Sequence, residues 1–401
     1  MDNRLIYLDH NATTPTDPRA VEAMLPYFYE HPGNAASRSH PFGWIADEAV
    51  DQARTQVAAL INVAPKEIVF TSGATESDNL ALKGVFEMYH RKGNHIITVK
   101  TEHKAVLDTC EKIEKMGGEV TYLDVNTDGL IDLEVLEAAI KPTTILVSVM
   151  WANNETGVIQ PMQKIGQICA KHSVLFMSDA TQAVGKIPVD PKAFGVHLMS
   201  FSAHKMYGPK GIGALFVNSR QPRVKVTEQM NGGGHEGGMR SGTLNVPAIV
   251  GFGKAAEIAG QEMQQDEKRL RRLRDKLENA LITQLEAVTV NGHQEQRMGH
   301  VSNLSFKLVE AERLMKTFNQ NIAVATGSAC TSASLEPSYV LKAHGLSDDL
   351  AQSAIRFSLG RSTTEQDIDY TIEAVLKGVQ QMRMQNPIWE MYQEGIDVER
   401  I

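Results

Sequence analysis

Leu198-Met199-Ser200-Phe201-Ser202-Ala203-His204-Lys205-Met206-Tyr207-Gly208-Pro209-Lys210-Gly211 is the stretch that organises this chain. Its first four residues form a short apolar run, which predicts a buried strand. A serine hydroxyl, a histidine and a lysine would then stand at the carboxyl end of that strand, where open α/β sheets bind their ligands. The same residues also fit a surface loop with two lysines and a hydrogen-bonded histidine. Other parts of the sequence are needed to distinguish a ligand site from such a loop.

Short runs rich in β-forming residues recur at 68–70, 96–99, 120–123, 144–150, 174–177, 198–201 and 213–217. Amphipathic helical patterns separate most of them, for example at 130–140 and 162–172. This alternation predicts an α/β fold, with a mostly parallel sheet covered by helices on both faces. The last two runs are too close for a helical crossover, so we expect that pair to be antiparallel.

A long helical pattern from about 246 to 285 follows the glycine-rich turn 232–238 and is suited to bridge two domains. At 401 residues the chain is also too long for one small core. We therefore expect a large domain over residues 16–262. A smaller α+β domain would combine residues 1–15 with 263–401.

The composition is that of a globular protein, with 42% hydrophobic and 22% charged residues. The net charge of −8 argues against a surface dedicated to nucleic acid or to anionic membranes. The N-terminal residues lack the pattern of a secretory signal, and no apolar run approaches the ~18 residues of a membrane span. Three widely spaced cysteines then favour free thiols in a reducing, cytoplasmic setting over a disulfide framework.

Polar residues follow several of the expected strands. Gly73-Ala74-Thr75 begins a helix that should run to about residue 90. Its backbone N–H groups and the Thr75 hydroxyl suit a phosphate, although Ser72 or Thr75 would also serve as a plain N-cap. A helix start of this kind therefore fits either a phosphate site or an ordinary cap.

Asp179 follows a buried run, where a carboxylate needs a cation or several donors to offset the cost of burial. A protonated pyridine nitrogen is one such partner, and capping of the next turn is the alternative. Gln182 and Asn154 are placed to reach a phenolic oxygen of the same ligand, or are loop amides without a ligand. His103 follows another strand and suits stacking and proton transfer on position alone.

Lys205 is a candidate to form an imine if partial burial and cationic neighbours lower its pKa. Lys210 is the rival, and we expect the Gly-Pro turn before it to direct it to solvent. A lysine of this kind, an acid for a pyridine nitrogen and phosphate-binding groups are what pyridoxal phosphate chemistry requires. The pattern therefore indicates a pyridoxal phosphate site at the strand ends.

Two further residues suit the chemistry of a substrate. Cys330 lies within ten small residues, 325–334, which indicate a flexible loop and an accessible thiol, whereas Cys110 and Cys169 lie in partly apolar helical contexts and should be buried. An incidental loop cysteine is the alternative. Arg356 in the strand-like run 354–358 suits bidentate capture of a carboxylate, or else a structural salt bridge.

These residues resemble, in their order, the cysteine desulfurases of the NifS/IscS type, a class V group of the fold-type I pyridoxal phosphate enzymes. The matching segments run nearly from end to end: Tyr7-Leu8-Asp9-His10-Asn11-Ala12-Thr13-Thr14-Pro15, Thr71-Ser72-Gly73-Ala74-Thr75-Glu76-Ser77, Asn153-Asn154-Glu155-Thr156-Gly157, Asp179-Ala180-Thr181-Gln182, Ser202-Ala203-His204-Lys205, Arg240-Ser241-Gly242-Thr243 and Gly327-Ser328-Ala329-Cys330-Thr331-Ser332. Jointly they are highly specific, although none would be so alone.

The resemblance implies roles for these residues. Lys205 would be the Schiff-base lysine, Asp179 the partner of the pyridine nitrogen, and His103 the stacking proton shuttle. The remaining cofactor-binding residues would be Ala74, Thr75, Ser202 and His204, with Asn154 and Gln182 at the ring oxygen and Thr243 supplied by the other subunit of an obligate homodimer. Arg356 and Asn154 would bind L-cysteine, and Cys330 would accept its sulfur as a persulfide, leaving L-alanine.

The resemblance also implies partners. The loop sequence and the tail 389–395 are similar to those of the housekeeping subgroup, in which the tail helps to dock an iron–sulfur scaffold protein. Cys330 would pass sulfur to such acceptors and is a candidate ligand of an iron–sulfur cluster shared with the scaffold. Gly237 and Thr326 depart from the usual arginine and serine of the family motifs. A selenocysteine lyase or another fold-type I enzyme is the alternative activity, and a cofactor-free regulatory protein is a further rival.

Overall fold

The computed structural model describes residues 5–327 and 336–396. Its central sheet has seven strands in the order β2-β8-β7-β6-β5-β3-β4. Their bounds are β2 Ile68–Thr71, β3 His95–Val99, β4 Glu119–Leu123, β5 Thr144–Ser148, β6 Leu175–Asp179, β7 Leu198–Ser202 and β8 Gly213–Val217. Only β8 runs antiparallel to its neighbours, β7 and β2. The expected α/β fold with a mostly parallel sheet is therefore confirmed, including the antiparallel last pair.

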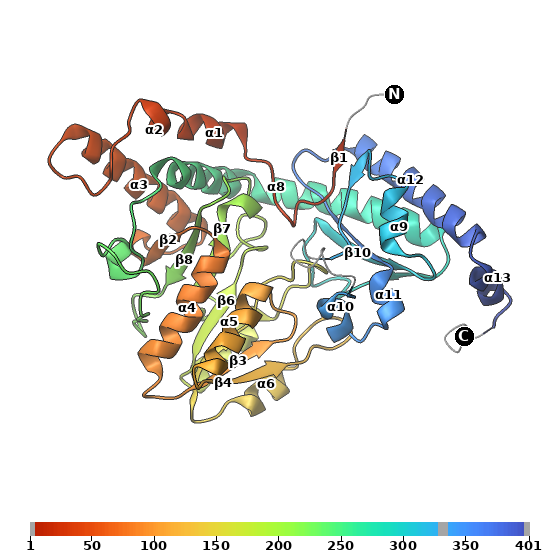
Figure 1. Cartoon of the computed structure of the whole chain (residues 1–401), viewed down its shortest axis with the longest axis horizontal. Helices are drawn as coiled ribbons and strands as arrows, with labels where there is room; N and C mark the ends of the chain where they lie inside the picture. The colour runs from red at the N-terminus through yellow and green to blue at the C-terminus, as the bar shows by residue number, and fades with distance from the viewer. Residues whose placement is uncertain (1–4, 328–335, 397–401) are drawn as a thin grey trace.

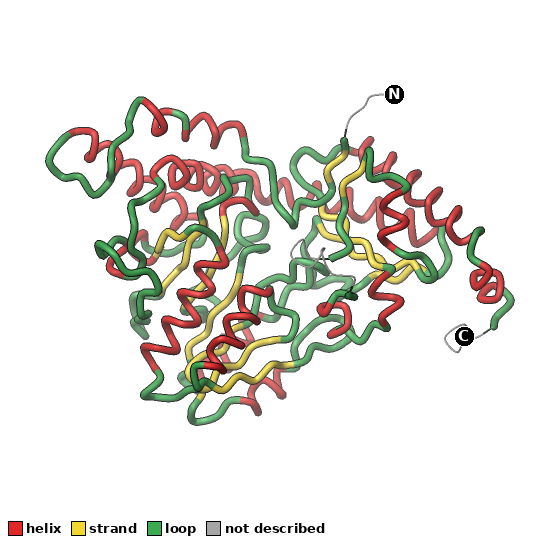
Figure 2. Tube along the Cα trace, viewed as in Figure 1, coloured by secondary structure: helices red, strands yellow, loops and turns green. Residues whose placement is uncertain are grey.

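Helices cover both faces of this sheet because successive strand residues point to opposite sides (Figures 1 and 2). Ile96 packs with α4 (Ala74–Tyr89) and α5 (Lys104–Lys115), whereas Ile97 belongs to the core on the other face. That second core includes α3 (Pro41–Leu60), α7 (Met162–Lys171) and the first half of α8 (Val246–Gln284). Both faces are thus apolar, which explains why the strands read as continuous apolar runs.

The long helix α8 connects this sheet to a second, smaller unit (Figure 1). Ile249 and Phe252 pack in the core of the seven-stranded sheet, whereas Leu273 and Leu277 pack in another core. The second core includes β10 (Val301–Phe306), β12 (Ala354–Ser358) and α12 (Glu365–Met384). We propose that the boundary expected at residue 262 falls where α8 passes between these two cores.

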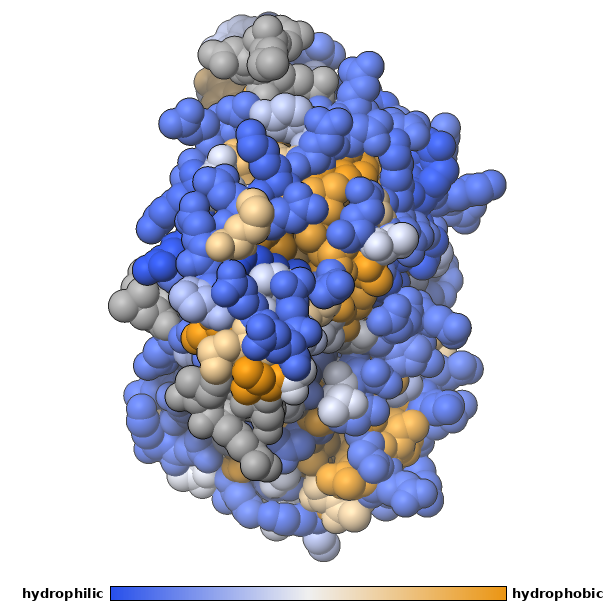
Figure 3. All heavy atoms as spheres, turned by 90° about the vertical axis from the view of Figure 1, so that its right-hand side faces the viewer, coloured by the Kyte–Doolittle hydropathy of each residue, from blue (hydrophilic) through white to orange (hydrophobic). Residues whose placement is uncertain are grey.

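The N-terminal strand β1 (Ile6–Tyr7) pairs in parallel with β11 (Ile322–Ala323), so the chain begins beside the smaller unit. The remaining elements are α1 Pro18–Met24, α2 Pro26–Tyr29, α6 Leu133–Ala139, β9 Val288–Val290, α9 Ala311–Lys316, α10 Tyr339–Ala343, α11 Asp348–Gln352, α13 Pro387–Gln393 and the short 3-10 turns Pro65–Glu67, Ala203–Lys205 and Glu236–Gly238. Figure 3 shows the end of the molecule that carries α12 and α13 as mainly hydrophilic. Among the described helices, none combines the length and apolarity needed to cross a membrane.

Candidate active site

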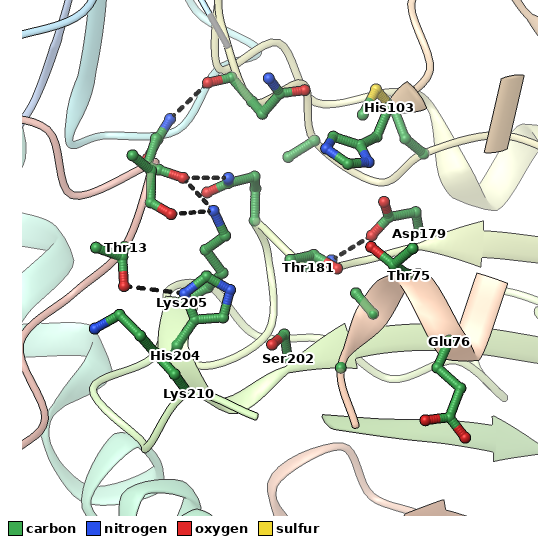
Figure 4. A pocket seen from close by; sticks show the side chains of 18 of the residues that line it. Thr13, Thr75, Glu76, His103, Asp179, Thr181, Ser202, His204, Lys205 and Lys210 are labelled. Carbon is green, nitrogen blue, oxygen red and sulfur yellow. Dashed lines mark hydrogen bonds between the residues drawn. The ribbon is translucent and has the colours of Figure 1, made fainter. Parts of the chain in front are cut away.

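A cavity of about 510 Å³ lies at the carboxyl ends of the central strands (Figure 4). The ends of parallel strands meet at one edge of the sheet, so residues far apart in the chain converge there. Ten of the expected site residues line the cavity: Ala74, Thr75, His103, Asn154, Asp179, Gln182, Ser202, His204, Lys205 and Arg356. Thr243 is exposed and is not among the lining residues, and Cys330 lies outside the described part of the chain.

One end of the cavity is a group of hydrogen-bond donors. Helix α4 begins after Gly73, and no side chain caps its first N–H groups, so the alternative of a plain cap by Ser72 or Thr75 is wrong. Ser202 and His204 line the same region (Figure 4). Burial lowers the pKa of His204 to about 4, and Nδ1 of its neutral ring lies 3.0 Å from Oγ1 of Thr13. Uncapped N–H groups at a helix start favour an anion.

Asp179 places a buried carboxylate on the cavity wall, and Figure 4 draws it beside Thr75. Its Oδ1 accepts from the backbone N–H of Thr181 at 2.9 Å, so it caps the next turn while also facing the cavity. Asp78 and Glu102 lie behind it, and burial raises the pKa of each well above its usual range, with Asp179 as a further cause. Burial therefore favours the protonated forms of Asp78 and Glu102, and of these three acids Asp179 is the one that lines the cavity.

His103 stands at the start of α5, where Nδ1 accepts from the backbone N–H of Ala105 at 3.2 Å. Nδ1 therefore carries no proton, and the proton of the neutral ring is on Nε2. Burial is the largest cause that lowers the pKa of His103, while Asp179 opposes it. In Figure 4 the ring lies on the same side of the cavity as Asp179. A neutral imidazole at this position is able to accept a proton.

Lys205 follows β7 in the turn Ala203–Lys205, and its Nζ donates to the main-chain carbonyls of Asn11 and Ala12, each at 2.6 Å. Nε2 of Gln182 donates to the same Asn11 carbonyl at 3.0 Å. Lys210 is exposed as expected, although it also lines the cavity. No role was predicted for Asn11. Its segment matched the family motif, but the residue type indicated no particular chemistry.

Arg356 on β12 is buried and holds Asp9 and Asn154. One terminal nitrogen lies 2.7 Å from Oδ1 of Asp9, and the other donates to the main-chain carbonyl of Asn154 at 2.9 Å. Within the described residues, Nε of Arg356 and Oδ1 of Asn154 have no hydrogen-bond partner. The guanidinium therefore forms a structural ion pair with Asp9, which was the alternative to carboxylate capture. Its Nε–H has no described partner and is available to a ligand.

The other two cysteines are buried, as the sequence predicted. Burial raises the pKa of the Cys169 thiol to about 12 and raises that of Cys110 further. Neither thiol is therefore a nucleophile near neutral pH. Across residues 5–327 and 336–396, no group of histidine, cysteine and acidic side chains is arranged to hold a metal ion.

Comparison with known proteins agrees with this geometry. The aminotransferase class-V family model matches residues 6–371. The cysteine desulfurase IscS of Dechloromonas aromatica (strain RCB) is 57% identical over 397 residues, which cover 99% of this chain and 97% of its relative. A NifS-like protein of known structure has a TM-score of 0.86 at 37% identity, covering 93% of this chain and 98% of its own. SspA in complex with cysteine has a TM-score of 0.78 at 34% identity, covering 88% and 98%.

The chain therefore belongs to the class-V aminotransferase family, whose members depend on pyridoxal phosphate. Within this family it is one of the cysteine desulfurases of the NifS/IscS type, which confirms the resemblance drawn from the motifs.

Proposed function

We propose that the cavity binds pyridoxal phosphate and L-cysteine, and that the protein transfers the sulfur of L-cysteine to Cys330. The observation that carries this proposal is the convergence of Lys205, Asp179 and the uncapped start of α4 on one cavity. These groups fit the aldehyde, the pyridine nitrogen and the phosphate of the cofactor in their chemistry. Oδ1 of Asn154, buried and without a partner among the described residues, is a further polar atom available to a ligand.

The cofactor, when bound, supplies an electron sink that makes the α-proton of an amino acid acidic. Asp179, the one of the three buried acids that lines the cavity, would pair with the pyridine nitrogen. Thr75, Ser202, His204 and the first N–H groups of α4, including that of Ala74, would hold the phosphate. Gln182 and Asn154 are placed to donate to the ring oxygen.

Arg356 would hold the substrate carboxylate through the N–H that has no partner among the described residues. Lys205 would move the α-proton, and His103 would take a proton from the substrate thiol at Nδ1, which would first have to release the N–H of Ala105. Overall, the substrate C–S bond breaks and an S–S bond forms at Cys330. The enzyme thiol and L-cysteine thus become a persulfide and L-alanine, with sulfur oxidised and carbon reduced.

We also propose that two copies of the chain complete the site. Thr243 is exposed and lies away from the cavity of its own chain, which agrees with a role in the site of a second subunit. Exposed aromatic side chains at Phe28, Tyr29, Phe42 and Trp44 supply apolar surface for such a contact. The cytoplasmic location stays a prediction.

Sulfur acceptors, including an iron–sulfur scaffold, would receive the persulfide, and the tail 389–395 is a proposed docking segment. Trp389 itself is packed against Arg383, whose guanidinium lies 4.0 Å from the ring centroid, and against Tyr392. Other side chains of the tail would therefore have to meet the scaffold. An iron–sulfur cluster ligated by Cys330 and shared with the scaffold is also part of this proposal.

The test is to incubate the purified, cofactor-loaded protein with L-cysteine and to measure L-alanine and protein-bound persulfide before a reductant is added. We expect one L-alanine for each persulfide. Keto-acid formation instead would indicate an aminotransferase, and strict dependence on L-selenocysteine would indicate a selenocysteine lyase. Protein that acquires no cofactor absorbance with pyridoxal phosphate would indicate the cofactor-free rival.

Gly213 offers a separate test of the phosphate end. It begins β8 beneath the start of α4, and a Cβ atom there would lie 2.7 Å from Cα of Gly73. Gly213→Ala should displace Gly73 and weaken the apparent affinity of cofactor-free protein for pyridoxal phosphate about tenfold. Gly260→Ala is the matched control, because its Cβ would meet only Cδ1 of Leu60 at 4.0 Å. Equal affinity of the two variants for pyridoxal phosphate would mean that the phosphate does not bind at the start of α4.

A further inference from the structure

Lys186 carries an amine that the proposed reaction does not use, yet its contacts lead directly to Lys205. Its Nζ lies 3.1 Å from Oε1 of Gln182, 3.4 Å from Oδ1 of Asn11 and 3.2 Å from Nε2 of His300. Asn11 is also the residue whose main-chain carbonyl accepts from Lys205 and from Gln182. We refer to Asn11, Gln182, Lys186 and His300 as the Asn11 cluster.

The orientation of each amide in the Asn11 cluster is fixed by its other contacts. Nδ2 of Asn11 donates to the main-chain carbonyl of Asn154 at 3.0 Å, so Oδ1 is the atom that faces Lys186 and His300. Nε2 of Gln182 donates to Asn11, so its Oε1 faces Lys186. Oδ1 of Asn11 lies 2.9 Å from Nε2 of His300. Because a carbonyl oxygen only accepts, Nε2 of His300 has to carry a proton.

Counting donors and acceptors then indicates the state of Lys186. An uncharged amine has two N–H groups for the oxygens of Gln182 and Asn11, and a lone pair that shares the one N–H of His300 with Oδ1 of Asn11. An ammonium would instead direct its third N–H at the N–H of His300. Among the described residues, the hydrogen-bond contacts of Lys186 include no carboxylate that would offset a charge. The uncharged amine is thus the form that satisfies every partner.

The surrounding charges favour the same form. Burial lowers the pKa of Lys186 well below 10.5, and Lys205 and Arg356 lower it further. Asp266 and Glu267 line a small cavity beside Lys186, but Arg361 and Arg271 engage them. The titratable and charged groups that face Lys186 and His300 are Lys205, Arg356, His10, Arg274, Tyr207, Asp266 and Glu267.

We propose that Lys186 is an uncharged amine in the native protein and a positioning residue for Lys205, acting through Asn11 and Gln182. Its two N–H groups hold the side-chain oxygens of Asn11 and Gln182, and these residues fix the carbonyl that holds the Lys205 amine. Only the chemical role of Lys205 rests on the proposed function. The charge of Lys186 is measured without turnover.

The first test compares thermal unfolding of the cofactor-loaded protein and its Lys186→Met variant between pH 7 and pH 9. Between the lowered pKa of native Lys186 and the usual lysine pKa of 10.5, Lys186 is protonated in the unfolded chain but not in the native protein. Native stability relative to the variant therefore rises with pH across this window. For a chain of this length, the difference between the two unfolding midpoints should grow by about 1.5 °C per pH unit.

Lys100→Met is the control, because Lys100 is an exposed lysine paired with exposed Asp124. Its midpoint difference should not change with pH. A pH-independent difference for Lys186→Met as well would mean that native Lys186 is protonated, which would overturn the proposal. If Lys186→Met does not fold, ¹⁵N NMR of labelled lysine amines on the unsubstituted protein gives the same answer. One amine besides Lys205 that titrates well below pH 10.5 supports the proposal, and its absence overturns it.

The positioning role is tested by the rate at which cofactor-free protein captures pyridoxal phosphate covalently. Lys186→Met should slow capture about tenfold, whereas Lys100→Met should not, since only the first removes the donor that holds Oε1 of Gln182 and one of the donors to Oδ1 of Asn11. Equal rates for the two variants would overturn the positioning role. Covalent capture of pyridoxal phosphate by Lys205→Ala would contradict the proposed function. It would not affect the charge of Lys186, which is measured separately.

Discussion

Replacing Lys205 with alanine is expected to lower the release of L-alanine from L-cysteine by at least about 10³-fold. The amine would be both the attachment point of the cofactor and the group that moves the α-proton, so one substitution removes two functions. Its position supports this expectation, because Nζ lies at the cavity wall, held by the carbonyls of Asn11 and Ala12. Initial rates of L-alanine formation at saturating pyridoxal phosphate provide the measurement.

Lys210→Ala is the informative comparison for Lys205→Ala. Lys210 lines the same cavity but is exposed, and none of its described contacts holds it toward Asn11. We expect Lys210→Ala to cost less than about tenfold in rate. If Lys210→Ala lost more activity than Lys205→Ala, Lys210 and not Lys205 would be the reactive lysine.

Cys330→Ser is expected to have a comparably large effect, a loss of about 10³-fold or more in persulfide formation and in L-alanine release. A hydroxyl is a far weaker nucleophile toward sulfur than a thiolate. Cys110 and Cys169 offer no replacement, because both are buried and burial raises the pKa of each thiol. Covalent capture of pyridoxal phosphate at Lys205 should be unchanged.

Labelled L-cysteine, followed by mass spectrometry of the intact chain, measures persulfide formation. Cys169→Ala is the control, and it should keep most of the labelled sulfur. Full transfer of label to the Cys330→Ser chain would mean that another residue accepts the sulfur. That result would contradict the persulfide route while leaving the cofactor site intact.

The strands of the central sheet and their mostly parallel direction could be predicted because the signals for them are local. Each central strand is buried on both faces, so runs such as 198–201 are mostly apolar and end at polar residues. The expected helix 246–285 corresponds to α8, whose start is marked by Asn245 accepting from the N–H of Ala248. The edge strand β4 was less well defined, since it begins at exposed Glu119 rather than at Val120.

The lining of the cavity could be predicted in part for the same reason. Asp179, His103 and Lys205 each follow a strand, and the ends of parallel strands meet at one edge. The contacts of Asn11 could not be predicted, because they join residues 143 to 347 positions apart. Lys186 and His300 carry no local pattern that indicates their meeting. Such contacts depend on how the two cores pack around α8.

The covalent attachment of pyridoxal phosphate is the central claim, and one measurement tests it most directly. Cofactor-saturated protein is treated with borohydride, digested, and searched by mass spectrometry for the lysine that carries the reduced cofactor. The account predicts a single modified lysine, Lys205. Modification of Lys210 or Lys186 in its place, or an unmodified Lys205 in fully loaded protein, would contradict it.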